Sequence, residues 1–89
     1  MIRVRVVVSG TVQGVFFRDS CRRQAVAHQV NGWVRNQVDG SVEAVFEGAP
    51  HAVGAMIDWT RHGPPKASVT HVDVHDEAPE GLNGFEVRP

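Results

Sequence analysis

The first part of the chain alternates between apolar and polar positions and then changes to a helical spacing. The alternating aliphatic residues are Ile2, Val4, Val6 and Val8. This period of two predicts a β-strand over residues 2–9 with one buried face. A helix is expected to follow, with a thin stripe on one side. The residues of this stripe are Phe17, Cys21, Gln24, Ala25 and His28.

The segment GWVRNQVDGSVEAVFEG, residues 32–48, predicts a β-hairpin around Asp39 and Gly40. A two-residue loop would put Val34 and Asn36 on one face with Ser41, Glu43 and Val45. A three-residue loop with Gly40 left-handed would put them with Val42, Ala44 and Phe46. The second register gives the more apolar face, so we expect it. Asn36 is then a polar residue within an apolar face.

The rest of the chain predicts one more helix and two more strands. Pro50 suits the first position of a helix, and the GPP turn at 63–65 would end it. Residues 70–75 alternate as a strand does, and Phe85 and Val87 indicate a short last one. The order is βαββαβ with an extra edge strand, which predicts a ferredoxin-like α+β sandwich. Its antiparallel sheet would have four to five strands, with two helices on one face. No linker or repeat appears, so we expect one domain over residues 1–89.

Composition and charge exclude several function classes. The 89 residues carry nine Lys and Arg against ten Asp and Glu, without a basic stretch typical of nucleic-acid binding. The start of the chain is too short and too interrupted for a signal peptide or a membrane span. The single cysteine, Cys21, permits no internal disulfide and no cysteine metal cluster, so a reducing, cytoplasmic location is expected.

The loop GTVQGV, residues 10–15, joins the first strand to the first helix. Consecutive backbone amides can converge on an anion at such a junction, although a glycine-assisted turn is the simpler interpretation. It is not a Walker loop, because Gly14 is followed by Val15 instead of Lys and Ser or Thr. Arg18 then lies in the first helical turn, where a cation is disfavoured. Either Asp19 compensates for it, or an anion is held between the amides and the guanidinium. Residue chemistry alone favours neither alternative.

Asn36 is the second anomaly. An asparagine in the middle of a strand, on an apolar face, is costly unless its amide is satisfied. It could bond to a neighbouring loop. Equally, its carbonyl could hold a water molecule in place, as amide side chains do in some phosphate hydrolases.

The stretches GTVQGVFFR, residues 10–18, and GWVRNQVDGSVEAVFEG resemble the two signature stretches of the acylphosphatase family, in the same order and at the same separation. The GPP turn, the strand that follows it and the terminal Phe85-x-Val87 are also similar. The resemblance therefore spans nearly all of the chain.

This resemblance implies an acylphosphatase, a hydrolase that splits the carboxyl–phosphate bond of small acyl phosphates without a metal or cofactor. Inorganic phosphate would be its product or inhibitor. The enzyme would be a cytoplasmic monomer without nucleic-acid or membrane partners. The phosphate would be held by the backbone amides of six consecutive residues: Gln13, Gly14, Val15, Phe16, Phe17 and Arg18. The side chain of Arg18 would bind the phosphate oxygens, and Asn36 would orient the attacking water.

The sparse set of side chains suits this chemistry. The leaving group is a carboxylate whose conjugate acid has a pKa near ~4, so it departs without a general acid. Two other function classes remain: a non-catalytic anion-binding module that keeps the loop, and an RNA-binding βαββαβ domain. The second requires exposed aromatics among basic residues on the central strands.

The chain departs from the family pattern at His28 and Gln29, where relatives commonly have an aliphatic residue and a glycine. We expect the helix cap there to be strained, or shifted towards Asn31 or Gly32. Cys21 is expected to be a small buried hydrophobe. The set His71, Asp73 and His75 would share one strand face, and a solvated surface is the favoured interpretation over a metal site.

Overall fold

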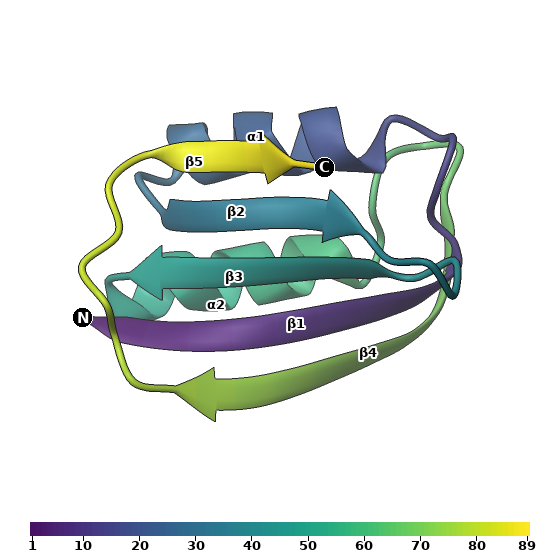
Figure 1. Cartoon of the computed structure of the whole chain (residues 1–89). Helices are drawn as coiled ribbons and strands as arrows, with labels where there is room; N and C mark the ends of the chain where they lie inside the picture. Colours follow the sequence, from purple (N-terminus) through teal and green to yellow (C-terminus); the bar gives the residue numbers. More distant parts are fainter.

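The computed structural model describes all 89 residues, and Figure 1 shows one layer of strands with two helices behind it. The elements in chain order are β1 (Ile2–Thr11), α1 (Phe17–Ala27), β2 (Asn31–Asn36), β3 (Val42–Gly48), α2 (Pro50–Thr60), β4 (Ser68–Glu77) and β5 (Phe85–Arg88). The predicted strands and helices are confirmed, including the helix that begins at Pro50 and the short last strand.

The strands form one sheet in the order β4-β1-β3-β2-β5, and both helices cover the same face of it (Figure 1). This confirms the ferredoxin-like α+β fold. The expected antiparallel sheet is wrong at one edge: the five-stranded sheet is mixed, because β5 pairs in parallel with β2 while the other neighbours are antiparallel. The chain after β4 crosses the end of the sheet before β5 begins, so β5 runs in the same direction as β2 (Figure 1).

The core lies between the sheet and the helices, and it fixes where α1 begins. Phe17, at the start of α1, is 2% exposed and packs against Trp59 of α2 with ring centroids 5.1 Å apart. Cys21 and Ala25 continue this buried stripe along α1. Because successive residues of a helix are about 100° apart, the burial of Phe17 turns its neighbour Arg18 away from the core.

The hairpin has the three-residue loop and the register that its apolar pattern predicts. Asn36 pairs with Val42 and Val34 with Ala44, so Asn36 lies on the face that the helices cover. The amide of Gln37 donates to the carbonyl of Ser41 at 2.9 Å and closes the loop. Gly40 has a φ of +96°, a value that glycine adopts without a steric penalty.

The end of α1 carries the strain that the sequence predicts, and the cap has not shifted. The amide of Gln29 donates to the carbonyl of Val26 at 3.1 Å, and that of Val30 to the carbonyl of Ala25 at 2.8 Å. These two bonds form a Schellman motif, which puts Gln29 at the left-handed position with a φ of 58°. His28 is the C-cap and is exposed, so its predicted place on the buried stripe is wrong.

We predict that Gln29→Gly raises the free energy of unfolding by about 1 kcal/mol. A left-handed conformation costs an L-residue about 1–2 kcal/mol, whereas glycine adopts it without a comparable cost. Urea unfolding followed by circular dichroism measures the change. Gln24→Gly is the control inside the same helix, and it should lower the free energy of unfolding by about 1 kcal/mol. A lower stability for Gln29→Gly would contradict the prediction.

A buried carboxylate holds the connection between β4 and β5. Glu47 is 0% exposed and lies on the sheet face away from the helices. Its Oε1 accepts the amides of Gly81 and Leu82, both at 2.8 Å, and its Oε2 accepts the amide of Glu80 at 2.9 Å. The guanidinium of Arg3 adds a contact of 3.4 Å. Burial alone raises the pKa of Glu47, but these donors outweigh burial and the net pKa is lowered.

This carboxylate predicts a specific loss of stability in acid. Because the folded-state pKa of Glu47 lies below the unfolded value of about 4.3, its stabilisation is complete above that pH. It is lost as the pH falls through the folded pKa. We expect Glu47→Gln to cost about 2 kcal/mol at pH 7, and the difference from wild type to shrink as the pH falls below about 4.3 and through the folded pKa. Glu86→Gln, at an exposed residue of β5, is the control and should show little difference at any pH. A constant deficit for Glu47→Gln would refute the link to its charge.

Candidate active site

The loop between β1 and α1 leaves a row of backbone amides without partners. No amide of residues 13–18 donates a hydrogen bond to another backbone carbonyl, and no side chain caps the start of α1. Phe16 is the N-cap residue, with a left-handed φ of 64°, so α1 begins at Phe17 and Arg18 lies in its first turn. Free amides at a helix N-terminus present partial positive charge to an anion.

Arg18 is not compensated by its neighbour. Both oxygens of Asp19 are taken by other arginines: Oδ1 lies 3.3 Å from Nη2 of Arg22, and Oδ2 lies 3.0 Å from Nη2 of Arg23. Arg18 itself forms no salt bridge within the chain. Of the two interpretations that the sequence leaves open, compensation by Asp19 is therefore wrong. A cation without a partner stands beside the free amides.

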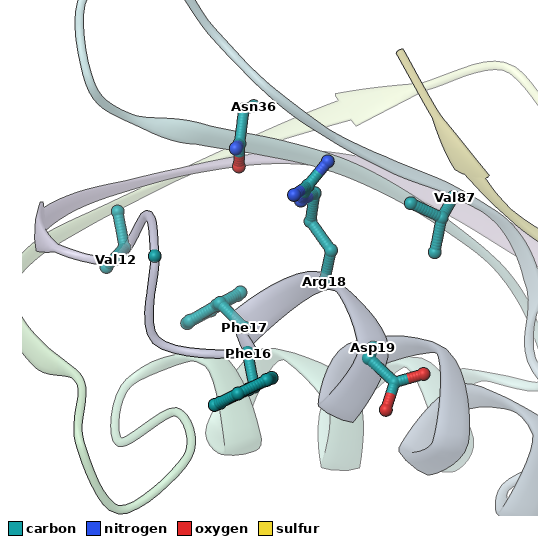
Figure 2. A pocket seen from close by; sticks show the side chains of 8 residues that line it. Val12, Phe16, Phe17, Arg18, Asp19, Asn36 and Val87 are labelled. Atoms are coloured by element: carbon teal, nitrogen blue, oxygen red, sulfur yellow. The ribbon is translucent and has the colours of Figure 1, made fainter.

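Asn36 meets Arg18 across a cavity. Its Oδ1 is buried and has no hydrogen-bond partner, so the carbonyl does not bond to a neighbouring loop. Figure 2 shows the side chain of Asn36, from the end of β2, and that of Arg18, from α1, directed toward each other. The cavity has a volume of about 410 Å³. It is lined by Val12, Gly14, Phe16, Phe17, Arg18, Asp19, Asn36 and Val87.

The structure thus brings together most of the site residues expected from the sequence. Gln13 and Val15 do not line the cavity; Val15 packs against the core. The side chain of Gln13 instead donates to the carbonyls of Gln37 and Ser41, at 2.8 and 2.9 Å. Sequence reasoning missed this side-chain contact and also missed Val87. The terminal Phe85-x-Val87 pattern was the one signal for Val87, and it does not say which strand β5 joins.

The remaining candidates of the sequence do not form a second site. Cys21 is buried, as predicted, and burial raises the pKa of its thiol far above the usual range, so it stays a neutral thiol. His71 Nε2 lies 2.8 Å from Asp73 Oδ1 on the exposed surface of β4. No three His, Cys, Asp or Glu side chains lie together in a way that could hold a metal ion. Neither helix has the length and apolar character that crossing a membrane requires.

The opposite face of the sheet does not fit RNA binding. Its aromatic ring is that of Trp33, which contacts the guanidinium groups of Arg35 and Arg88 at 5.4 and 4.8 Å from the ring centroid. Phe46 and Phe85 stack on each other with centroids 6.0 Å apart, and Phe46 is buried in the core. The interleaved exposed aromatics that an RNA-binding sheet needs are therefore not present on the central strands.

Comparison with known proteins identifies the family. The model of the acylphosphatase family matches residues 4–87. The chain belongs to the acylphosphatase family. It is 59% identical over 87 residues to an acylphosphatase of Rubrobacter xylanophilus, covering 97% of this chain and 79% of the relative.

Two solved acylphosphatases have the same fold. The structure from Coxiella burnetii is 40% identical with a TM-score of 0.94, over 98% of this chain and 92% of that one. The structure from Bacillus subtilis is 33% identical with a TM-score of 0.97, and each chain is covered in full (100%). The family hydrolyses acyl phosphates, so this acylphosphatase is a hydrolase that acts on acid anhydrides.

The lone buried acceptor in this acylphosphatase predicts that Asn36→Leu stabilises the fold. Leucine has nearly the same shape, and removing an unsatisfied polar atom from an apolar face should add about 1 kcal/mol to the free energy of unfolding. Urea denaturation measures it. Asn31→Leu, at the other end of β2, is the control, because Oδ1 of Asn31 accepts the amide of Gly84 at 3.0 Å. That variant should lose stability; a loss in Asn36→Leu as well would contradict the prediction.

Proposed function

We propose that the hydrolysis takes place in this cavity, without a metal or cofactor, with the phosphate held by the amides of residues 13–18 and by Arg18 while Asn36 orients the water. One observation carries the proposal. Free amides, an unpaired cation and an unsatisfied amide side chain come together from separate elements in one cavity. Asn36 Oδ1 is buried without a partner, and Arg18 is exposed without a carboxylate partner; a phosphate with its attacking water would give the amides, Arg18 and Asn36 partners at once.

Charge complementarity supports the phosphate-binding role. The planar guanidinium of Arg18 can give two parallel hydrogen bonds to two phosphate oxygens. The amides at the start of α1 add the positive end of the helix dipole. Phosphoryl transfer passes through a loose transition state, which needs chiefly positioning and charge stabilisation, and one well-aimed donor can supply about 3 kcal/mol.

The lining of the cavity favours an acyl phosphate over a phosphate ester. Its titratable side chains are Arg18 and Asp19, and the carboxylate of Asp19 is paired with two arginines. No side chain of the cavity is thus poised to protonate a leaving group. A carboxylate needs no proton, because its conjugate acid has a pKa near ~4, whereas an alkoxide does.

In the proposed reaction, the oxygen of a water held by Asn36 forms a bond to phosphorus. The bond from phosphorus to the acyl oxygen breaks, and its electron pair leaves with the carboxylate. A proton of the water passes to a phosphate oxygen, which yields inorganic phosphate. The substrate thus supplies the base, and the chain supplies position and positive charge.

We further propose that the protein works as a cytoplasmic monomer. Cys21, the one cysteine of the chain, is a buried free thiol, which fits a reducing compartment. We also propose that residues 1–89 form a single domain, which contains the proposed site.

We expect Arg18→Ala and Asn36→Ala each to lower the turnover of benzoyl phosphate at least about 100-fold while the fold survives, because each removes one preorganised group. Steady-state assays in the presence of a chelator measure the loss, and circular dichroism checks the fold. Arg61→Ala and Asn83→Ala are matched controls at exposed residues outside the cavity. Near-native turnover of Asn36→Ala would disprove its role.

The same assays separate the alternatives. A non-catalytic anion-binding module would bind inorganic phosphate without turning over benzoyl phosphate. A preference for a phosphate monoester over the acyl phosphate would overturn the proposed chemistry, since a monoester needs help for its leaving group.

A further inference from the structure

We propose that the side chain of Gln13 is a positioning residue, which fixes the phosphate-binding loop to the β2–β3 hairpin and so sets the distance between the amide cradle and Asn36. This inference rests on the function proposed above. The backbone amide of Gln13 belongs to the cradle, but its side chain points to the hairpin and does not line the cavity.

The contact joins the loop to both sides of the hairpin, at the residue that follows β2 and the residue that precedes β3. The Nε2 atom of Gln13 donates one hydrogen to the carbonyl of Gln37, at 2.8 Å, and the other to the carbonyl of Ser41, at 2.9 Å. Gln37 directly follows Asn36, and Ser41 directly precedes Val42, which is the partner of Asn36 in the sheet. The side chain therefore holds the hairpin one residue beyond the pair that contains Asn36.

The hairpin end is itself well fixed. Ser41 Oγ lies 2.7 Å from Oε1 of Gln37 and 2.6 Å from Oδ1 of Asp39, and the amide of Ser41 donates to the same Asp39 oxygen at 2.9 Å. The bonds from Ser41 hold the pKa of Asp39 below its usual range, so the carboxylate stays an acceptor. The side chain of Gln13 is thus bonded to the two residues that these hydrogen bonds join, and not to the exposed loop residues 38–40.

The loop needs such an anchor because its own backbone provides none. The amides of residues 13–18 are free, which suits an anion but leaves the loop without backbone bonds to the hairpin. The two bonds of Gln13 are the only side-chain hydrogen bonds from residues 12–16 to another part of the chain. A primary amide is also the group that fits, since it offers two hydrogens to two carbonyls, which a carboxylate or a thioether cannot do.

A positioning role predicts a particular kinetic signature. The cradle lies within one short segment, so it can still bind phosphate when the side chain of Gln13 is removed. The distance from the cradle to Asn36 depends on how the loop and the hairpin are placed relative to each other. A misplacement of one against the other by about 1 Å can lower the rate about 100-fold. Turnover should therefore fall far more than phosphate affinity.

The test compares Gln13→Met with Gln24→Met, which makes the same chemical change at a half-buried residue of α1 outside the site. We expect the kcat of Gln13→Met for benzoyl phosphate to fall about 10- to 100-fold, with the Kd of inorganic phosphate by calorimetry within about threefold of wild type. Gln24→Met should retain the wild-type kcat. An unchanged kcat in Gln13→Met overturns the proposal. So does a parallel loss of kcat and phosphate affinity, because that indicates general disorder of the loop.

Gln13→Glu provides a second test that does not depend on how well Gln13→Met folds. Above its pKa, the carboxylate would face two carbonyl oxygens; below it, the carboxyl O–H can donate one of the two bonds. The kcat of this variant relative to wild type should therefore rise as the pH falls from 7 to 5. A flat ratio counts against the inference. Absence of turnover in the wild-type protein would instead refute the proposed function, so the two failures are distinguishable.

Discussion

The register of the β2–β3 hairpin is the constraint on which the site depends. Side chains alternate across a strand, so a shift of one residue would move Asn36 from the helix-covered face to the open face. Three features fix this register: the three-residue loop, the positive φ of Gly40 and the bond from Gln37 to Ser41. The same register puts Ala44 and Phe46 into the core. The packing that stabilises the sheet therefore also decides that Asn36 faces Arg18.

The polar and charged side chains on the two faces of the sheet differ in whether they have partners. On the open face, Arg3, Arg5 and Arg35 all have carboxylate partners, and Glu47 has backbone donors as well. Under the helix-covered face, Arg18 has no such partner and Asn36 Oδ1 accepts no hydrogen bond. The fold satisfies its polar groups elsewhere but leaves a few of them without partners in this one cavity. The free protein is therefore less stable at the cavity than it would be with these groups satisfied. Those groups are the ones that a phosphate can satisfy.

Sequence reasoning reached the element order and the hairpin register, because both follow from local periodicity and turn chemistry. Residue types alone singled out Arg18 and Asn36, whereas the other cradle residues were implied by the resemblance to the acylphosphatase family, and two of these, Gln13 and Val15, do not line the cavity. Asn36 stood out because it breaks the apolar pattern of its own strand. Arg18 stood out because a cation is disfavoured in the first turn of a helix. The strain at Gln29 was equally local. The contacts that escaped prediction join distant segments. No pattern of residue types says that Gln13 reaches Gln37 and Ser41, that Glu47 collects three amides from residues 80–82, or that Val87 comes beside α1.

In the proposed reaction, the selectivity of this site would lie more in the leaving group than in a shaped pocket. Its polar atoms can recognise a phosphate and a water, and its other lining side chains are apolar: Val12, Phe16, Phe17 and Val87. An alkyl phosphate could offer the same phosphate to the same amides. Its leaving group, however, would depart as a strongly basic alkoxide, and the cavity has no acid to protonate it. The carboxylate of an acyl phosphate departs unaided. A site that only positions the phosphate and neutralises its charge would therefore discriminate by the intrinsic reactivity of the bond, and the proposal extends this to acyl groups of varied shape.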